Sequence, residues 1–453
     1  MTLTLVPTEG DAPKPKESWE SLLKTRGKHD EVISIPWNAY VYFTHHEIFK
    51  GHIRWNKVAL RVEVTGGVLA NCPDPSNFDA LVTRAQDVLT TEFDISIGRE
   101  DVGRRLAYVA EENAYDPLQD YLSSLVWDGV PRIDSWLIEY GGADPGNDGY
   151  VGFVGRKWLL ACVARAFQPG CKADVVLVTE GNQGRGKSTL FYILGGQWYT
   201  EASGVLGDKD SKQLISAAWI CELPDMSSFS RTNRNAMKAF FSSAVDRYRP
   251  PYDKHTKAVK RRCCFGATTN EEEYLGDPTG NRRFQPVALG EIDRARLIKD
   301  KDQLWAEAVA IYKDAADCEA CAALDEVVPG EAARCEAHAW WLKPEQQSVA
   351  NRHAALREER DSWATTIQTF AKNPKRATHG GGDVELTTAN ILVNALQFQL
   401  KDIDRPDEMR VATIMKKLGY SRDRRGQDEP WKKADHKQPK FPISTTVYIA
   451  SLL

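Results

Sequence analysis

The stretch Gly181-Asn182-Gln183-Gly184-Arg185-Gly186-Lys187-Ser188 matches the pattern G-x-x-x-x-G-K-[ST] without a substitution. An apolar stretch typical of a strand, residues 173–180, precedes it, and a helix-like stretch, residues 188–194, follows it. Glycines let backbone N–H groups turn toward phosphate oxygens, and a helix N-terminus adds favourable partial charge. The order strand, glycine loop, helix therefore predicts an α/β fold with a parallel sheet and flanking helices, and a nucleoside triphosphate bound at the loop.

The residues of this loop have different predicted roles toward ATP and Mg²⁺. Lys187 can neutralise the β- and γ-phosphates, and the Ser188 hydroxyl can hold the Mg²⁺ ion. The backbone of the loop and the first helical turn would surround the phosphates. The nucleotide site is therefore predicted to comprise Gly181, Asn182, Gln183, Gly184, Arg185, Gly186, Lys187, Ser188 and Thr189.

A second apolar stretch typical of a strand, residues 217–222, ends in the carboxylate of Glu222, and a second acid, Asp225, follows it. Glu222 ends this strand 35 residues after Lys187, and a parallel layout would bring it beside the glycine loop. We predict that Glu222 activates water and, with Ser188, holds Mg²⁺, whereas Asp225 supports the ion indirectly. The alternative, stronger for Asp225, is that one of these acids merely caps the following helix.

A third strand, residues 262–270, ends in a polar amide. Asn270 is predicted to hydrogen-bond the γ-phosphate or the attacking water. Just beyond it, Arg282 and Arg283 stand in a tight polar turn that suits an arginine finger, a side chain inserted into a neighbouring subunit to stabilise transition-state charge. The alternative is a salt bridge to Asp277 or a surface position.

The segment between the second and third strands, residues 247–262, is strongly basic, with seven Lys or Arg against one Asp. Two prolines and a central Asp-Lys-His turn favour a hairpin over a helix. A basic hairpin interleaved with tyrosine suits a phosphate backbone, and the alternative is a solvated basic edge. The predicted DNA contacts are Lys254, His255, Lys257 and Lys260.

Several motifs recur together along residues 105 to 315. They are residues 125–132 (LVWDGVPR), 169–172 (PGCK), 180–184 (EGNQG), the acid-ended strand at Trp219, 249–252 (RPPY), 268–270 (TTN), 277–284 (DPTGNRRF) and 302–308 (DQLWAEA). Together they resemble the virulence-associated protein E family of phages and mobile islands, which is similar to superfamily 3 helicases with an AAA+-type ATPase core.

This resemblance implies a ring-forming, hexameric, DNA-dependent ATPase that acts in phage or mobile-element replication. It also implies that Lys254 and His255 lie at the tip of a channel hairpin that grips one strand of single-stranded or forked DNA. Many relatives fuse the helicase to a primase, but residues 1–150 show no convincing primase site. A separate primase or other replication proteins are therefore expected partners.

Two functions of different classes follow from these patterns. The first is an ATP-driven DNA helicase or translocase. The second is an ATP-regulated protein that binds an origin, or interferes with a competitor, without unwinding. A small-molecule P-loop kinase is a weaker third hypothesis, because the basic hairpin and the strand ending at Asn270 argue against it.

The bulk composition limits the class of protein. The formal charge of −4 shows that the chain as a whole is not a polycation, so nucleic-acid affinity must come from local patches. No run of 18 apolar residues and no secretory signal is visible. The nine cysteines then indicate reduced thiols, and we expect a protein of the bacterial host cytoplasm with no membrane partner.

The chain divides into five expected parts. Residues 1–30 are a flexible tail, 31–145 a mixed α/β region, 146–315 the ATPase core, 316–344 a cysteine-containing insertion, and 345–453 a small winged-helix-like module. In the last part, helices are expected near 388–400 and 410–418, followed by a basic, β-like end. This module would contact duplex DNA through phosphates or, alternatively, form a basic lid on the ATPase.

Cys318, Cys321, Cys335 and His338 form the pattern C-x₂-C-x₁₃-C-x₂-H. This spacing fits a four-ligand structural zinc site. The local composition is rich in Ala and Glu and has no glycine after the first pair, which favours two thiol-bearing helices instead. Both interpretations stay open.

Overall fold

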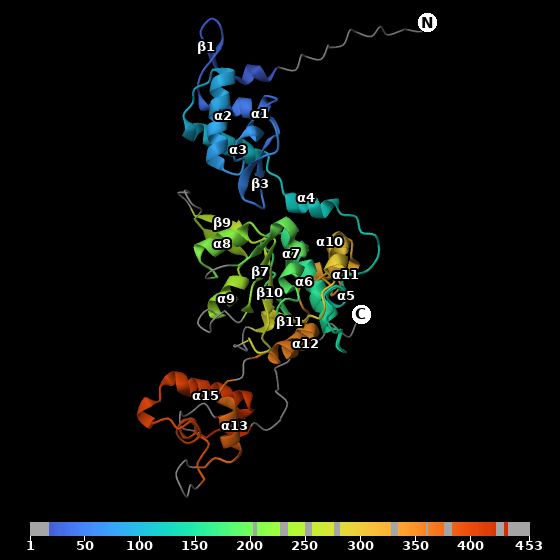
Figure 1. Ribbon diagram of the computed structural model, residues 1–453, viewed down its shortest axis with the longest axis vertical. Helices are drawn as coiled ribbons and strands as arrows, with labels where there is room; N and C mark the ends of the chain where they lie inside the picture. Colours follow the sequence, from blue (N-terminus) through green and yellow to red (C-terminus); the bar gives the residue numbers. More distant parts are fainter. Residues whose placement is uncertain are drawn as a thin grey trace, which may run out of the picture. The chain divides into compact units, whose positions relative to one another are not determined.

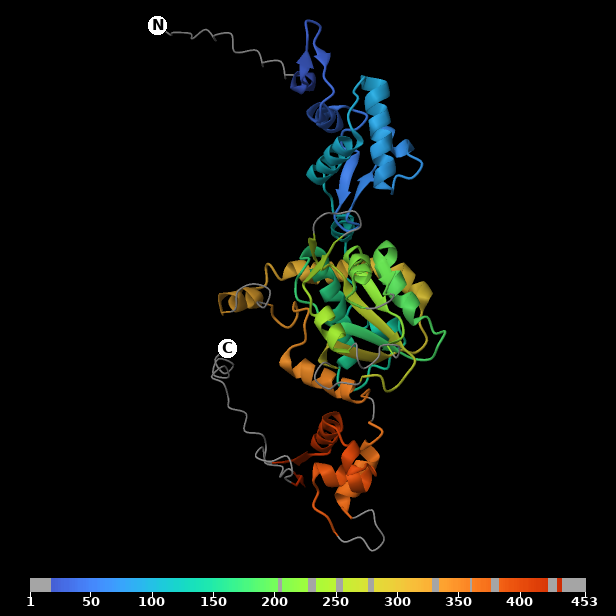
Figure 2. The ribbon, with the colours of Figure 1, turned by 90° about the vertical axis from the view of Figure 1, so that its left-hand side faces the viewer.

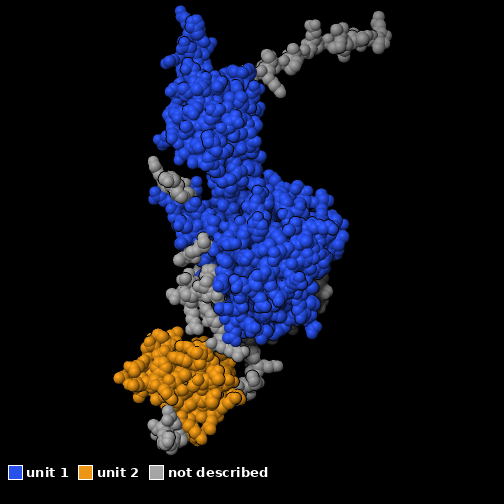
Figure 3. Space-filling view, in the orientation of Figure 1, with its two compact units in different colours: residues 1–358 blue, residues 359–453 orange. Residues whose placement is uncertain are grey.

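The structure, a computed structural model, describes residues 18–202, 206–226, 234–249, 256–275, 281–327, 334–358, 361–375, 383–422 and 430–433. The chain forms two compact units, Met1–Glu358 and Glu359–Leu453 (Figure 3). The C-terminal unit thus starts after the residue 345 expected from the sequence, because α12 (Pro344–Ala355) packs against α6 and β11 of the first unit. Within the described residues, no helix is both long and apolar enough to cross a membrane.

A five-stranded parallel sheet organises the middle of the chain (Figure 1), as the glycine loop predicts. Its spatial order is β11-β5-β10-β7-β6. The central position of β10 means that the strand ending before Asn270 lies between the strand before the glycine loop and the strand carrying Glu222. The strands are β5 (Val176–Glu180), β6 (Tyr199–Glu201), β7 (Ile220–Leu223), β10 (Cys264–Thr269) and β11 (Phe284–Ala288).

Each face of this sheet is buried under helices (Figure 2), which explains why the strands read as continuous apolar runs. Leu177 points into the core built with one helix set, whereas Val176 and Val178 point into the other core. The first face is covered by α6 (Tyr150–Phe167), α7 (Lys187–Gly195) and α10 (Arg294–Asp314), and the second by α8 (Lys209–Ser216) and α9 (Arg234–Phe241).

Helix α7, which follows the glycine loop, lies unusually close to the central strand. A Cβ atom added at Gly266 of β10 would come within 2.4 Å of the Phe191 ring of α7. Only glycine leaves room for this ring, so Gly266 sets the depth at which α7 rests on the sheet. This contact fixes the helix N-terminus next to the ends of β5 and β10.

The N-terminal region has its own core, built from three helices on a β-hairpin. Two of its helices are α3 (Arg99–Glu112) and α2 (Phe78–Phe93), which begins where the Asn77 side chain accepts from the Asp79 and Ala80 amides. The other elements of this core are α1 (Pro36–His45), β3 (Ile53–Asn56) and β4 (Arg61–Val64), which pairs antiparallel with β3.

Short elements complete the first unit. They are η1 (Trp19–Leu22), β1 (Thr25–Arg26), β2 (Glu31–Val32), η2 (Val68–Asn71), α4 (Pro117–Ser124), α5 (Trp136–Glu139), η3 (Gly196–Trp198), β8 (Val245–Tyr248), β9 (Lys257–Lys260), η6 (Asn281–Arg283) and α11 (Glu319–Val327).

The C-terminal unit contains helices followed by a two-stranded antiparallel ribbon, the order expected for a winged-helix-like module. Arg410 forms an ion pair of 2.8 Å with Asp361 and lies over the Trp363 ring, so this cation serves packing within the unit. Most of the basic stretch after Tyr420 lies outside the described residues. The elements are α13 (Ala364–Lys372), α14 (Thr388–Asn390), the π-turn η7 (Ile391–Ala395), η8 (Leu400–Asp402), α15 (Arg405–Lys417), β12 (Tyr420–Ser421) and β13 (Lys432–Lys433).

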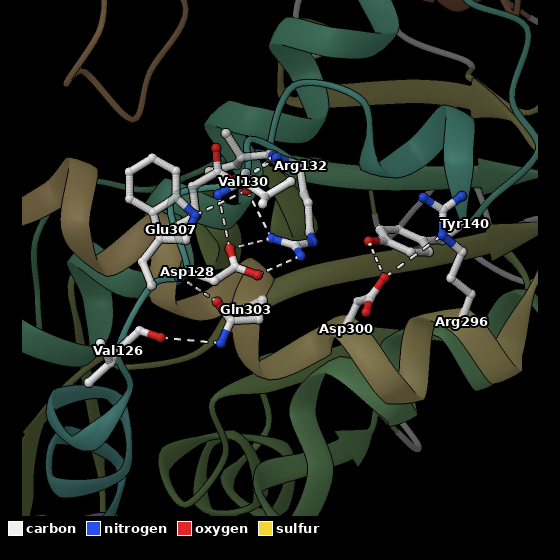
Figure 4. Close-up of polar contacts among 11 residues, drawn as sticks. Val126, Asp128, Val130, Arg132, Tyr140, Arg296, Asp300, Gln303 and Glu307 are labelled. Atoms are coloured by element: carbon white, nitrogen blue, oxygen red, sulfur yellow. Dashed lines mark hydrogen bonds and ion pairs between the residues drawn. The ribbon is translucent and has the colours of Figure 1, made fainter.

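Helix α10 holds the irregular segment 126–133 in place through its polar side chains (Figure 4). Gln303 bonds both ends of the first turn of this segment, donating to the Val126 carbonyl and accepting from the Asp128 amide. The buried carboxylate of Glu307 accepts the Arg132 amide at 2.7 Å and the Ile133 amide at 2.9 Å. These contacts join the two sequence motifs 125–132 and 302–308, which are far apart in the chain.

Two further contacts stiffen this region. Arg132 pairs with Asp128 at 2.7 Å and lowers the pKa of that carboxyl to about 2. The Tyr140 hydroxyl donates to Asp300 at 3.1 Å, on the same face of α10 as Gln303 (Figure 4).

Replacing Glu307 by alanine is expected to destabilise the chain by about 1–3 kcal/mol, because two buried amides lose their acceptor. Glu307→Gln, which keeps one carbonyl oxygen, serves as the matched control and should lose less. Burial raises the pKa of Glu307. Protonated Glu307 therefore stabilises the folded chain. This contribution to the free energy of unfolding is complete below the ordinary glutamate pKa of about 4.3, and it is lost as the pH rises through the higher pKa of the folded state.

Urea unfolding of wild type and Glu307→Gln at several pH values between acidic and neutral measures how the free energy of unfolding depends on Glu307. Wild type should lose stability relative to Glu307→Gln as the pH rises through that window. A pH-independent difference between the two would show that the carboxyl is not perturbed in the folded state.

Candidate nucleotide site

The glycine loop after β5 adopts a backbone that only glycines accept readily. Gly181, Gly184 and Gly186 have φ angles of 143°, 82° and 88°, in the region that strains residues with a Cβ atom. Gly186 is also the N-cap of α7, so the loop runs directly into a helix N-terminus. The local sequence thus produces a loop and helix dipole suited to an anion.

Lys187 is the first residue of α7 and is buried. Its ammonium donates to the carbonyls of Gly181 at 2.6 Å and Asn182 at 3.0 Å, and to the side-chain oxygen of Asn270 at 2.8 Å. Burial, followed by the nearby Arg185 charge, lowers the pKa of Lys187. The structure therefore brings Lys187 and Asn270, which are 83 residues apart, into direct contact across β5 and β10.

Glu222 lies on β7, fully buried, and faces the other side of the same loop. Its Oε1 accepts from Ser188 at 2.6 Å and from Thr268 at 3.0 Å, and its Oε2 accepts from the Tyr199 hydroxyl at 2.7 Å. Burial and this carboxylate raise the pKa of Tyr199. Glu222 therefore lies beside Ser188, its predicted partner in holding Mg²⁺, and its role in activating water stays a prediction.

Asp225 follows β7 and is exposed, with a left-handed φ of 54°. Its backbone amide lies 3.4 Å from the Thr268 hydroxyl, which also contacts Glu222. Asp225 is therefore at the same edge of the sheet as Glu222 but on the solvent side. The residues that follow, 227–233, lie outside the described chain, so the capping alternative stays a prediction.

The two arginines predicted as a finger have different surroundings. Arg283 pairs with Asp174 at 3.4 Å and donates to the Ser242 hydroxyl at 2.8 Å, whereas the Arg282 side chain is exposed. Both precede β11, whose register places Phe284 beside Val176 and Ala288 beside Glu180. Arg282 therefore lies at the sheet edge opposite the glycine loop, beyond a strand of five residues that itself spans ~13 Å. Asp277, the alternative partner, lies outside the described residues.

Sequence reasoning missed Arg294, the first residue of α10. A Cβ atom added at Gly186 would meet the Arg294 guanidinium at 2.7 Å, so this cation lies directly against the glycine loop. The only signal in the sequence is its place at a helix start after the N-cap Asp293. A buried anchor also supports the loop, since Glu180 accepts from Tyr274 at 2.8 Å and pairs with Arg357 at 2.8 Å.

The basic segment forms the predicted hairpin, in which β8 and β9 pair antiparallel. Two arginines of the segment form buried ion pairs within the fold. Arg261 pairs with Asp246, and Arg262 pairs with Asp116 at 2.8 Å. The charge counted from the sequence therefore overstates the charge available to a ligand.

The register divides the remaining cations between the two faces of the hairpin. Lys260 lies opposite Val245, and Arg247 follows on the same exposed face, whereas Lys257 lies opposite Tyr248 on the other face. Lys254 and His255 lie outside the described residues, so their predicted place at the tip stays a prediction.

The structure also brings together the four residues of the cysteine pattern. The ligand atoms of Cys318, Cys321, Cys335 and His338 all lie within 4.8 Å of one another. Cys321 lies on helix α11, but Cys335 and His338 lie on a turn. The expectation of two thiol-bearing helices therefore fails for the second pair.

These features define an α/β protein in which a glycine loop, an amide and a buried carboxylate meet at the carboxyl edge of a parallel sheet. The family model of the virulence-associated protein E-like domain matches residues 122–359, just over half of the 453-residue chain. The chain belongs to this family, as the recurring motifs indicate.

The chain was also matched, at low similarity, to solved structures. The apo structure of the NrS-1 C terminal region (305-718) is 12% identical with a TM-score of 0.35, covering 66% of this chain and 67% of that one. The A form apo structure of the NrS-1 C terminal region-CTR is 13% identical with a TM-score of 0.33, covering 55% and 57%. A second A form structure, CTR(305-718), is 12% identical with a TM-score of 0.36, covering 67% and 65%. No curated protein matches the chain.

Proposed function

We propose that the chain is an ATP-hydrolysing DNA motor, a helicase or translocase that works as a ring in the replication of a phage or mobile element. The observation that carries the proposal is the convergence of three strand ends on one loop. Lys187 contacts Asn270 at 2.8 Å, and Ser188 contacts Glu222 at 2.6 Å. A P-loop with a sensor amide and a buried acid is the equipment that triphosphate hydrolysis requires.

The residues at the loop fit a triphosphate with Mg²⁺. The turned amides, the α7 N-terminus, Lys187 and Arg294 supply positive charge for phosphate oxygens. The Ser188 hydroxyl and the Glu222 carboxylate form an oxygen donor pair of the kind that Mg²⁺ prefers. When bound, Mg²⁺ would neutralise the charge that develops on the phosphates. Asn270 would orient the γ-phosphate or water. Asp225, which is exposed beside the site, would support Mg²⁺ indirectly from the solvent side.

The position of Arg282 supports an oligomer. An exposed arginine at the edge opposite its own glycine loop cannot complete that loop, but it is free to enter the site of a neighbouring subunit. Heterologous contacts of this kind form a ring when the rotation between neighbouring subunits closes. Four further parts of the proposal rest on membership of the family. They are a hexamer, DNA as the substrate, a separate primase as partner and the bacterial cytoplasm as the place of action.

The β8–β9 hairpin supports DNA as the ligand. Arg247 and Lys260 lie together on an exposed face, which suits contact with a phosphate backbone. The C-terminal unit, with its helices and ribbon, would add contacts to duplex DNA.

ATP turnover with and without single-stranded DNA, together with release of a labelled strand from a fork, tests the proposal. Turnover should rise with DNA, and the strand should be released. Absence of ATP turnover under both conditions would refute it. ATP-dependent binding without strand release would instead support the origin-binding or interference protein.

The double variant Arg247→Ala/Lys260→Ala is expected to weaken binding of single-stranded DNA and to reduce the slope of log affinity against log salt by about 1.4, because two phosphate contacts are lost. Fluorescence anisotropy at several salt concentrations measures this. Lys50→Ala/Lys299→Ala removes two exposed cations elsewhere and should leave the slope unchanged. Equal slopes for both double variants would exclude the hairpin face from the DNA path.

A further inference from the structure

The four side chains of the cysteine pattern have the spacing of a tetrahedral metal shell. Sγ of Cys318 lies 4.0 Å from Sγ of Cys335, and Nδ1 of His338 lies 3.4 Å from Sγ of Cys321 and 3.1 Å from Sγ of Cys335. Zinc–sulfur and zinc–nitrogen bonds of about 2.3 and 2.0–2.1 Å place neighbouring ligand atoms roughly 3.5–3.8 Å apart. The separations found here lie near these values, so small shifts of the side chains would bring all four atoms to bonding distance from one ion.

The histidine is already oriented for this role. Its Nε2 lies 3.1 Å from Oδ2 of Asp314, at the end of α10. A carboxylate at Nε2 fixes the tautomer that leaves the Nδ1 lone pair facing the thiols, which is the usual arrangement around metal-bound histidines. The Cys335 amide also donates to the Cys321 sulfur at 3.3 Å, which fixes this sulfur against the turn that carries Cys335 and His338.

The turn that carries Cys335 and His338 is held from outside by helix α6. Lys157, a buried lysine, donates to the Glu336 carbonyl and, at 2.7 Å, to the Ala339 carbonyl, while Arg156 donates to the Ala337 carbonyl at 3.0 Å. Cys335 and His338 are therefore held facing Cys318 and Cys321, at the start of α11.

We propose that these residues bind one structural Zn²⁺ ion, with Cys318, Cys321, Cys335 and His338 as its four protein ligands. Four protein ligands close the coordination shell, so the ion would be structural and not catalytic. Binding releases the thiol protons and consumes no oxidant or reductant.

The ion would fix the chain between α10 and α12. Two and three residues after His338, Trp340 and Trp341 line a hollow of about 490 Å³ together with Arg282 and Arg283. Trp340 donates to the Lys172 carbonyl at 2.9 Å, which links this segment to the start of β5. Zinc would therefore hold the floor of the surface from which Arg282 projects. This role does not depend on whether ATP is hydrolysed.

Metal analysis of the full chain tests the proposal. We expect about one zinc per chain after purification without added chelator. Chain refolded with Co²⁺ should show the visible absorption of a tetrahedral thiolate site. Cys335→Ser should lose most of the metal, whereas Cys72→Ala, a buried cysteine of the N-terminal core, should keep it.

His338→Cys keeps four ligands and covers the case in which Cys335→Ser does not fold. It should retain the metal and shift the cobalt spectrum toward that of four thiolates. A zinc-free wild type whose three thiols react freely and which gives no cobalt–thiolate absorption would overturn the proposal, as would an unchanged cobalt spectrum in His338→Cys.

Discussion

Lys187→Ala is expected to lower ATP turnover by at least about 100-fold, because removal of one preorganised charged donor at a reacting oxyanion costs that much. The ammonium lies against Gly181, Asn182 and Asn270, at the point where the phosphates would enter. Steady-state phosphate release, with and without single-stranded DNA, measures the loss.

The control for this variant is Lys299→Ala, which removes an exposed lysine of α10 and should leave turnover at the wild-type level. Circular dichroism of both variants should show that the fold is kept. Turnover by Lys187→Ala within about twofold of wild type would exclude the loop as the hydrolytic site.

Arg282→Ala is expected to reduce ATP turnover by about 10³-fold while ATP binding persists, because an arginine finger acts on transition-state charge. Arg282 is free to reach a neighbour, since its side chain is exposed at the sheet edge opposite its own loop. Phosphate release and binding of a fluorescent ATP analogue separate the two effects.

Arg283→Ala is the matched control, one residue away. Arg283 is held by Asp174 and Ser242, so its loss should lower the unfolding midpoint and change turnover much less. If only Arg283→Ala abolished turnover, the arginine finger would be Arg283 and not Arg282. If neither variant lost turnover, no finger would come from this turn.

The central fold could be predicted because its signals are local. The apolar strand, the glycine loop and the helix at 173–194 are contiguous, and the positive φ angles of Gly181, Gly184 and Gly186 are what their glycines permit. Glu222 and Asn270 could be placed near Lys187 because parallel strands share a carboxyl edge, where loops and side chains meet.

What the sequence could not provide depends on contacts between distant segments. Arg294 meets the loop through the packing of α10, which no local pattern encodes. Arg261 and Arg262 count as hairpin charge in the sequence, yet Asp246 and Asp116 neutralise them inside the fold. The same limit applies to Glu222, whose partners Thr268 and Tyr199 come from two other strands.

The cysteine pattern shows how composition can mislead. Alanine and glutamate around Cys335 favour a helix by propensity, but Lys157 and Arg156 bind the carbonyls of residues 336–339 and hold a turn instead. The spacing of the four residues does not depend on helix propensity, and it correctly predicted that their side chains lie together.

The most direct test of the composite site is a mixture of the two inactive variants, Lys187→Ala and Arg282→Ala. In a shared ring, an Arg282→Ala subunit supplies an intact loop and its Lys187→Ala neighbour supplies an intact arginine. An equal, random mixture should then recover about a quarter of wild-type turnover, since one interface in four is complete. No recovery at any ratio, in rings shown to contain both variants, would contradict a site completed by a second subunit.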